Sequence, residues 1–153
     1  MAKHVGVKLP DDLYALLKSE KAIGILATFS EKGVPHTTPL QCIYPKGRES
    51  LLAAIHKDHD GYHNMVWQKK VMISFLGDDN VCYSILGRAG VVRAPSFVHP
   101  MMNIVRIDII DIKCDQSILV KVDKGVQWSF TSIDAQDVID SLFQELRELG
   151  RTL

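Results

Sequence analysis

The chain has 153 residues, of which 46% are hydrophobic, and this is enough to form the core of a single domain over residues 1–153. Its 18 lysine and arginine residues equal its 18 aspartate and glutamate residues, so a net charge of zero gives no basic footprint for nucleic acid or for an anionic membrane. No apolar run approaches the roughly 20 residues of a membrane span, and the N-terminal stretch lacks the apolar part of a secretory signal, so we expect a cytoplasmic protein.

The first part of the chain predicts a short helix followed by a β-hairpin. Pro10 and the two acidic residues after it suit the first turn of a helix over residues 10–20, because proline needs no N–H there and the acids face the positive end of the helix dipole. The apolar run "AIGILATF" (22–29) is typical of a buried strand. A turn with glycine and proline then leads to the return strand "HTTPLQCIY" (36–44).

The middle of the chain predicts three strands and one short helix. The strands are "LLAAIH" (51–56), "VMISFL" (71–76) and a long one over residues 81–94, whose internal glycines indicate a bulge or a bend. Apolar residues at helical spacing predict the helix over residues 62–70, and Asp60 is a candidate for its N-cap.

The last part predicts a strand, a hairpin and a closing helix. Residues 104–113 read as the strand, and "SILVKV" and "VQWSFT" as the hairpin. One apolar face predicts a helix over residues 134–149, with Asp134 or Ser132 as its cap. Many hairpins without a β-α-β rhythm favour a mainly β, α+β fold, an antiparallel barrel with short flanking helices and a C-terminal helix.

The stretch "AAIHKDHDGYHNM" (53–65) raises the main question about function, because it holds three histidines, at positions 56, 59 and 63. If residues 59 to 63 were helical, His59 and His63 would share a face and could bind a divalent metal. No second cluster of ligands elsewhere in the sequence completes such a site, so we predict no metal. Taken alone, the residues also fit a solvated polar loop.

Three stretches resemble the pyridoxamine 5′-phosphate oxidase-like, FMN-binding split-barrel family. They are "ATFSEKGVPHTTPL", "LLAAIHKDHDGYHNMVWQKKVMISF" and "YSILGRAGVV", and they occur in the family's order. The resemblance covers residues 9–94 and is looser to about residue 131. It implies an antiparallel split β-barrel and a homodimer with FMN at the interface between the subunits.

The resemblance also implies which residues bind the cofactor. In the family, the strand that carries "TTPLQ" lies beside the flavin ring, and the next strand and its loop, here "IHKDHDG", hold the phosphate. Carried over by position, the cofactor-binding residues are Thr38, Pro39, Leu40, Gln41, Ile55, His56, Lys57, His59, Asp60 and Gly61.

The chemistry of the loop suits a phosphate in part. Lys57 supplies a cation, and His56 and His59 can donate hydrogen bonds. A helix that begins near Gly61 would offer free N–H groups, and glycine would let a ligand approach the backbone. Asp60, however, stands where many family members have lysine. Either Asp60 caps the helix, or the phosphate pocket is weak, or the ligand is different.

These observations lead to one functional hypothesis with named alternatives. We expect an FMN-binding flavoprotein, an oxidoreductase with a small-molecule substrate that the sequence does not identify, and we can name no catalytic residue. The alternatives are a non-catalytic flavin binder, a haem- or metal-binding protein that uses His56, His59 and His63, and a protein that binds the deazaflavin F420. Pyridoxamine-phosphate oxidation itself would need a basic cluster after residue 95 for a second phosphate, and we find none.

Three further residues have weaker claims. Trp128 could cover a flavin from the other subunit, although a core or interface position is the more common role of such a tryptophan. Trp67 is expected to pack, and Arg88, which could reach an anion, is expected to be solvated.

Overall fold

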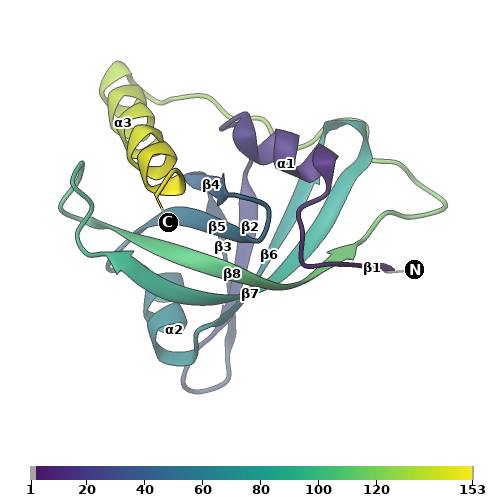
Figure 1. The fold of residues 1–153 in the computed structure, drawn as a ribbon, viewed down its shortest axis with the longest axis horizontal. Coiled ribbons are helices and arrows are strands. Elements are labelled where there is room, and N and C mark those ends of the chain that lie inside the picture. The colour runs from purple at the N-terminus through teal and green to yellow at the C-terminus, as the bar shows by residue number, and fades with distance from the viewer. Residues whose placement is uncertain (1–2, 153) are drawn as a thin grey trace.

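The computed structural model describes residues 3–152, which form one curled antiparallel sheet with three α-helices around it (Figure 1). The strands are β1 (Lys3–Gly6), β2 (Gly24–Phe29), β3 (Pro35–Leu40), β4 (Ile43–Lys46), β5 (Ser50–His56), β6 (Lys70–Gly77), β7 (Val81–Arg93) and β8 (Met102–Cys114). The helices are α1 (Asp11–Lys18), α2 (Asp60–Gln68) and α3 (Ile133–Gly150), and a 3₁₀ turn, η1 (Asp78–Asn80), joins β6 to β7. None of these helices is long and apolar enough to cross a membrane.

The sheet has the order β3-β2-β6-β7-β8-β5-β4, with β1 paired to β8, and every pairing is antiparallel. This curled sheet with its C-terminal helix confirms the mainly β split-barrel fold. The bend predicted from glycine is present in β7, where the register with β8 shifts at Gly87. A Cβ at Gly87 would lie 2.4 Å from Cγ2 of Ile107, so only glycine fits where β7 crosses β8.

Two hydrophobic clusters hold the sheet and its helices together. Inside the curl, alternate residues of β6 such as Ile73 and Phe75 point inward and are buried, and α1 closes this core with Leu13 and Leu17. The second cluster lies between α3 and the β4–β5 side of the sheet. Its helical residues are Leu142, Phe143 and Leu146.

The predicted return strand 36–44 is wrong as a single element. Its first part is β3, which pairs with β2 at one edge of the sheet, and its second part is β4, which pairs with β5 at the other edge. The chain leaves one edge at Leu40 and joins the other at Ile43. Both of these residues are buried, so the apolar pattern continues across a break in the strand pairing that the pattern does not reveal.

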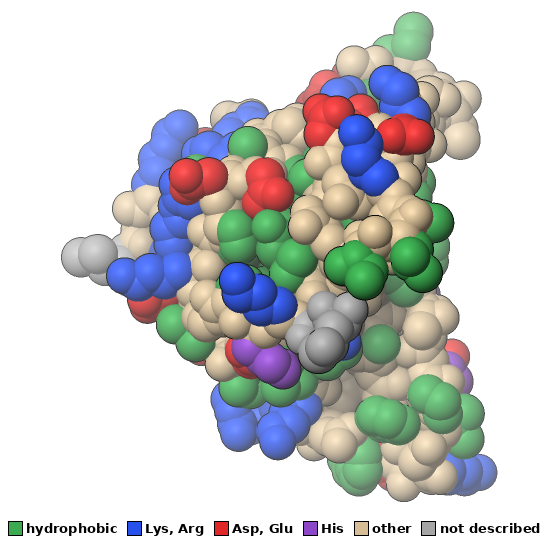
Figure 2. Space-filling view, turned by 90° about the vertical axis from the view of Figure 1, so that its right-hand side faces the viewer, with side chains coloured by type: hydrophobic (Ala, Val, Ile, Leu, Met, Phe, Trp, Pro, Cys, Tyr) green, Lys and Arg blue, Asp and Glu red, His purple; other side chains and the backbone are tan. Residues whose placement is uncertain are grey.

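The predicted hairpin of "SILVKV" and "VQWSFT" is also wrong, since no strand lies between β8 and α3. The segment runs along the side of the molecule shown in Figure 2, where hydrophobic side chains lie in groups among charged ones. Ile118, Leu119 and Val120 are 93%, 87% and 71% exposed. A strand forms only where another strand edge pairs with it, and within residues 3–152 no edge pairs with this segment.

Two further elements were missed or left open by the sequence. The strand β1 was not predicted, because its side chains are all exposed and show no apolar alternation. The cap of α3 is Ser132, whose Oγ accepts a hydrogen bond from the N–H of Ala135 at 3.0 Å, whereas Asp134 lies in the first turn.

Candidate functional site

The strand β3 and the loop between β5 and α2 meet at Thr38 and His59. The Oγ1 atom of Thr38 lies 3.0 Å from Nε2 of His59, and Nδ1 of His59 accepts a hydrogen bond from the N–H of Gly61 at 3.0 Å. Since Nδ1 accepts, the ring proton is on Nε2, which donates to the threonine hydroxyl. Both ring nitrogens are therefore engaged within the protein. The Thr38 hydroxyl donates its own proton to the carbonyl of Pro39 at 3.5 Å, a contact so long that a ligand phosphate would compete with it readily.

The prediction that Asp60 caps α2 is wrong. The cap is His59, and Asp60 is the first residue of the helix, where its carboxylate faces the positive end of the helix dipole. The side chain of Asp60 is exposed and lines the same hollow as Thr38 and His59. Its charge is thus available to repel an anion that binds there.

Two hollows adjoin the contact between Thr38 and His59, and both of these residues line both hollows. The larger, about 220 Å³, is lined by Thr28, His36, Thr37, Thr38, His59, Asp60 and Gly61. The smaller, about 140 Å³, is lined by Thr38, Pro39, Leu40, Gln41, Ala54, Ile55, His56, His59 and Met102. Of the predicted cofactor-binding residues, all except Lys57 thus line one hollow or the other.

Lys57 lies at the rim of this region. Its N–H donates to the carbonyl of Met101 at 2.8 Å, which fixes its backbone beside β8, while its side chain is exposed. Within residues 3–152, no carboxylate forms an ion pair with the Lys57 ammonium. The ammonium is therefore available to pair with an anion that binds nearby.

Gly61 also has a role in packing, in addition to the predicted approach of a ligand to its backbone. It is buried, and a Cβ there would lie 3.2 Å from Cδ2 of Leu26 and 3.3 Å from Nδ1 of His59. Glycine thus lets the first turn of α2 pack against β2 and receive its histidine cap.

Sequence reasoning missed several lining residues. His36 and Thr28 are paired across β3 and β2, and the side chain of Asn64 donates to Oγ1 of Thr28 at 3.0 Å. The alternation of β3 places His36 on the same face as Thr38, a signal that the sequence already contained. Met102 comes from β8, opposite His56, and only the sheet pairing brings it there.

The three histidines of residues 53–65 point to different surroundings. No group of three histidine, cysteine, aspartate or glutamate side chains converges on one point in the described part of the chain. His63 is exposed on α2, and His56 uses Nδ1 to accept the N–H of Asp58 at 3.2 Å. The cysteine beside the site offers no nucleophile, because burial, aided by the charge of Glu20, raises the pKa of Cys42 to about 12.

Of the three residues with weaker claims, Trp67 differs from expectation. Trp128 lies on the α1 side of the sheet, where its Nε1 donates to the carbonyl of Lys21 at 3.0 Å, and Trp67 is 51% exposed rather than packed. Arg88 is exposed, as a solvated arginine would be.

A comparison with protein-family models matches residues 9–121 to the family described as pyridoxamine 5′-phosphate oxidase. The chain belongs to this pyridoxamine 5′-phosphate oxidase family. The match contains both hollows and ends before α3, which begins at Ile133. No curated protein matches the sequence.

Solved structures show the same fold at low sequence identity. A candidate pyridoxamine 5′-phosphate oxidase from Lactobacillus delbrueckii superposes with a TM-score of 0.61 at 19% identity, over 72% of this chain and 98% of that one. An F420 reductase gives 0.58 at 17% identity, over 68% and 98%. HutZ, the haem storage protein of Vibrio cholerae, gives 0.52 at 12% identity, over 66% and 90%. At such identities the likeness establishes the fold and leaves the cofactor open.

Proposed function

We propose that this chain is an FMN-binding oxidoreductase of the pyridoxamine 5′-phosphate oxidase family and works as a homodimer. The observation that carries the proposal is the contact between Thr38 and His59, which joins two hollows lined by the residues that the family resemblance implies. Family membership supports a flavin as the ligand.

The residues present fit a flavin phosphate, with one opposing charge. The Thr38 hydroxyl, the His36 ring and the Lys57 ammonium supply donors for a group that carries nearly two negative charges, and Asp60 opposes them. The smaller hollow, between Pro39 and Ile55, offers apolar walls to a ring. A bound flavin would supply hydride or electron transfer, and the protein would contribute its position and its electrostatic surroundings.

Each hollow is smaller than the roughly 300–1,000 Å³ of an ordinary ligand pocket, which supports completion of the site by a second copy. On the outer face of the sheet, Ile25, Phe29 and Met72 are 39%, 51% and 37% exposed. Thr37 and Pro39 share this face, since they pair across β2 with Ala27 and Ile25. A partner that covers the strip Ile25–Phe29–Met72 would thus also lie against the strand that contributes to both hollows.

The test of the cofactor is the absorbance spectrum of the purified protein, followed by titration with FMN. We expect the bands of oxidised flavin, and we expect Thr38→Val to weaken FMN binding roughly tenfold, because an isosteric side chain removes a donor to the phosphate. Thr131→Val, in the exposed segment before α3, is the matched control and should bind FMN as the unaltered protein does. Equal affinity in both variants, or no retained flavin at any FMN concentration, would contradict the proposal.

The same absorbance spectrum distinguishes FMN from the other candidate cofactors, a deazaflavin and haem. A deazaflavin would lack the long-wavelength flavin band, and haem would give a Soret band. The engagement of both His59 ring nitrogens within the protein speaks against haem ligation by this residue. A Soret band that disappears in the variant H59A/H63A would replace the flavin proposal with the haem one.

The test of the dimer is the mass in solution measured by light scattering. We expect a dimer, and we expect Met72→Glu to shift it toward monomer and to weaken FMN binding together, because a buried unpaired charge opposes an apolar contact. Ile133→Glu is the matched control, since Ile133 is 78% exposed at the start of α3, away from the strip. A monomer that binds FMN at full affinity would overturn the shared site.

A further inference from the structure

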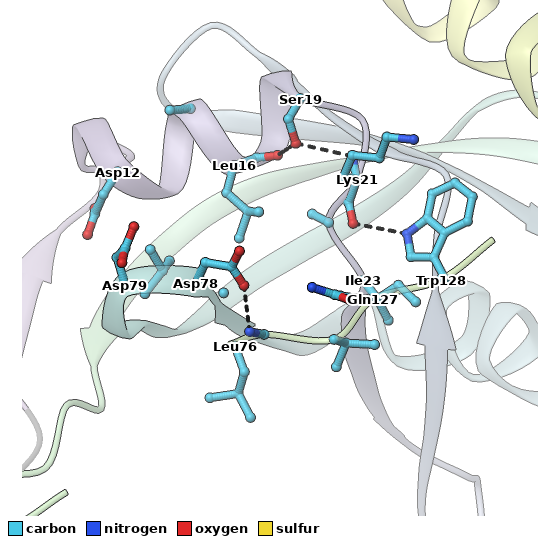
Figure 3. Close-up of a pocket in the computed structure, with 16 residues that line it drawn as sticks. Asp12, Leu16, Ser19, Lys21, Ile23, Leu76, Asp78, Asp79, Gln127 and Trp128 are labelled. Carbon is cyan, nitrogen blue, oxygen red and sulfur yellow. Dashed lines mark hydrogen bonds between the residues drawn. The ribbon is translucent and has the colours of Figure 1, made fainter. Parts of the chain in front are cut away.

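A large cavity of the described residues lies away from the proposed flavin site. Its volume is about 690 Å³, and it lies between α1, the turn that joins β6 to β7, and residues 125–128 (Figure 3). None of its lining residues lines either hollow beside Thr38 and His59. Whatever binds there does not compete for the flavin side chains.

Specific contacts fix the third wall of this cavity. The N–H of Gly125 donates to Oδ1 of Asp78 at 2.7 Å, and the indole N–H of Trp128 donates to the carbonyl of Lys21 at 3.0 Å. A Cβ at Gly125 would lie 2.5 Å from the carbonyl oxygen of Leu76, so glycine lets the segment lie directly on the end of β6. The wall is thus held at both ends by hydrogen bonds to the body of the protein.

The charged groups of the cavity are unevenly placed. Asp12, Asp78 and Asp79 line it together with a single cation, Lys21. Figure 3 shows Asp12 and Asp79 on one side and Trp128 with Lys21 on the other. The ammonium of Lys21 lies 5.3 Å from the centroid of the Trp128 indole, so the only lysine of the cavity is at the far end from this pair of carboxylates.

The two carboxylates at the acidic end differ in their partners. Asp12 accepts the hydroxyl of Tyr83 through both oxygens, at 2.9 and 3.1 Å, and its Oδ1 also accepts the N–H of Leu13 at 2.8 Å, which holds the group in place. No hydrogen bond or ion pair to the side chain of Asp79 occurs in the chain from residue 3 to residue 152. The donors to Asp12 are neutral, and within residues 3–152 neither Asp12 nor Asp79 forms an ion pair, so the negative charge of the acidic end is not compensated.

Apolar side chains connect the two ends of the cavity. Leu16 from α1, Leu76 from β6 and Val126 from the third wall line it, and Leu76 is 53% exposed although it is a large hydrophobic residue. An exposed apolar wall between an acidic end and an aromatic end suits a ligand with a positively charged head and an apolar body.

We propose that this cavity binds an amphipathic organic cation, an amine whose ammonium lies between Asp12 and Asp79 and whose apolar body lies along Leu16 and Leu76 toward Trp128. An anion of the same shape is excluded by the surplus of carboxylates. Its lining residues are distinct from those of the hollows beside Thr38 and His59, so its test is run both with and without FMN.

The experiment uses three probes with nearly the same body and different charge: phenethylamine, 2-phenylethanol and 3-phenylpropionate. Their binding is followed by NMR through the indole N–H signals of the two tryptophans. Trp128 lines the cavity, whereas Trp67 lies on α2 and serves as an internal control. We expect phenethylamine alone to shift the Trp128 signal in a saturable way, with weaker binding at high salt, and to leave Trp67 unchanged.

The variant Asp79→Asn separates charge from shape. Asp79 has φ of 57°, a conformation that asparagine tolerates, so the turn should keep its structure. We expect phenethylamine to bind roughly threefold more weakly to D79N, as for an exposed ion pair, and as tightly to the control Asp58→Asn as to the unaltered protein. Equal binding of all three probes, no saturable shift of Trp128, or unchanged affinity in D79N would each overturn the proposal.

Discussion

Replacing Glu145 with alanine should lower the free energy of unfolding by about 2–4 kcal/mol, the largest effect on stability that we expect from an ionic contact in this protein. The carboxylate of Glu145 in α3 is buried, with 5% of its side chain exposed, and it pairs with Arg93 of β7 at 2.7 Å. It also accepts the N–H of Phe97 at 2.8 Å and the hydroxyl of Ser96. Alanine would leave all three donors without this partner.

The same contact predicts a dependence of stability on pH. Burial by itself raises the pKa of Glu145, but the hydrogen bonds from Ser96, Phe97 and Arg93 outweigh burial and lower it below the ordinary value of 4.5. Because the pKa of Glu145 is lowered in the folded state, the stabilisation of the fold by its carboxylate is complete above pH 4.5. This stabilisation is lost as the pH falls through the folded pKa. Glu145→Gln should therefore flatten the acid side of the stability curve.

Chemical denaturation over a range of pH values tests both the loss of stability on replacing Glu145 with alanine and the flatter acid side on replacing it with glutamine. The matched control is Glu148→Ala, since Glu148 is exposed on the same helix and should change stability by less than about 0.5 kcal/mol. Equal losses for E145A and E148A would show that the contact does not hold α3 on the sheet. This matters for function, because the loop that Glu145 holds leads to Met101, whose carbonyl accepts the N–H of Lys57.

Lys57→Ala should weaken FMN binding roughly tenfold, and Asp60→Asn should strengthen it by roughly threefold to tenfold. The ammonium attracts the phosphate, and the carboxylate lines the larger hollow and repels it. The opposite signs are the decisive part of the prediction, because a variant that merely disturbs the fold would weaken binding in both cases. FMN titrations at two salt concentrations measure these effects, and both should shrink as salt increases.

Two variants serve as controls for these charges. Asp58→Asn removes a carboxylate from the same loop that lines neither hollow, and Lys124→Ala removes an exposed ammonium far along the chain. Both should bind FMN as the unaltered protein does. If D60N bound FMN no better than D58N, the phosphate would not lie in the hollow beside Asp60.

The sequence by itself predicted much of the fold and named most residues of the candidate site. Alternating and helical apolar patterns located α1, α2, α3 and the main strands, because burial on one face of an element is recorded in its own residues. The family motifs predicted residues around Thr38 and His59, and these line two adjoining hollows. The glycines in β7 predicted the bend at Gly87, because a residue without a side chain marks such a bend within the sequence of the strand itself.

Only the tertiary structure decided the features that depend on partners distant in the chain. The segment 36–44 reads as one strand, yet it joins opposite edges of the sheet. "SILVKV" also reads as a strand, yet no strand edge among residues 3–152 pairs with it. The choice of His59 over Asp60 as the cap of α2 depends on Thr38, which fixes the imidazole from another strand. The cavity beside Trp128 exists because residues 125–128 pack on α1 and on the end of β6. A residue pattern records what each element buries, but the pairing of edges and the partners of polar groups are set by the chain segments that meet in space.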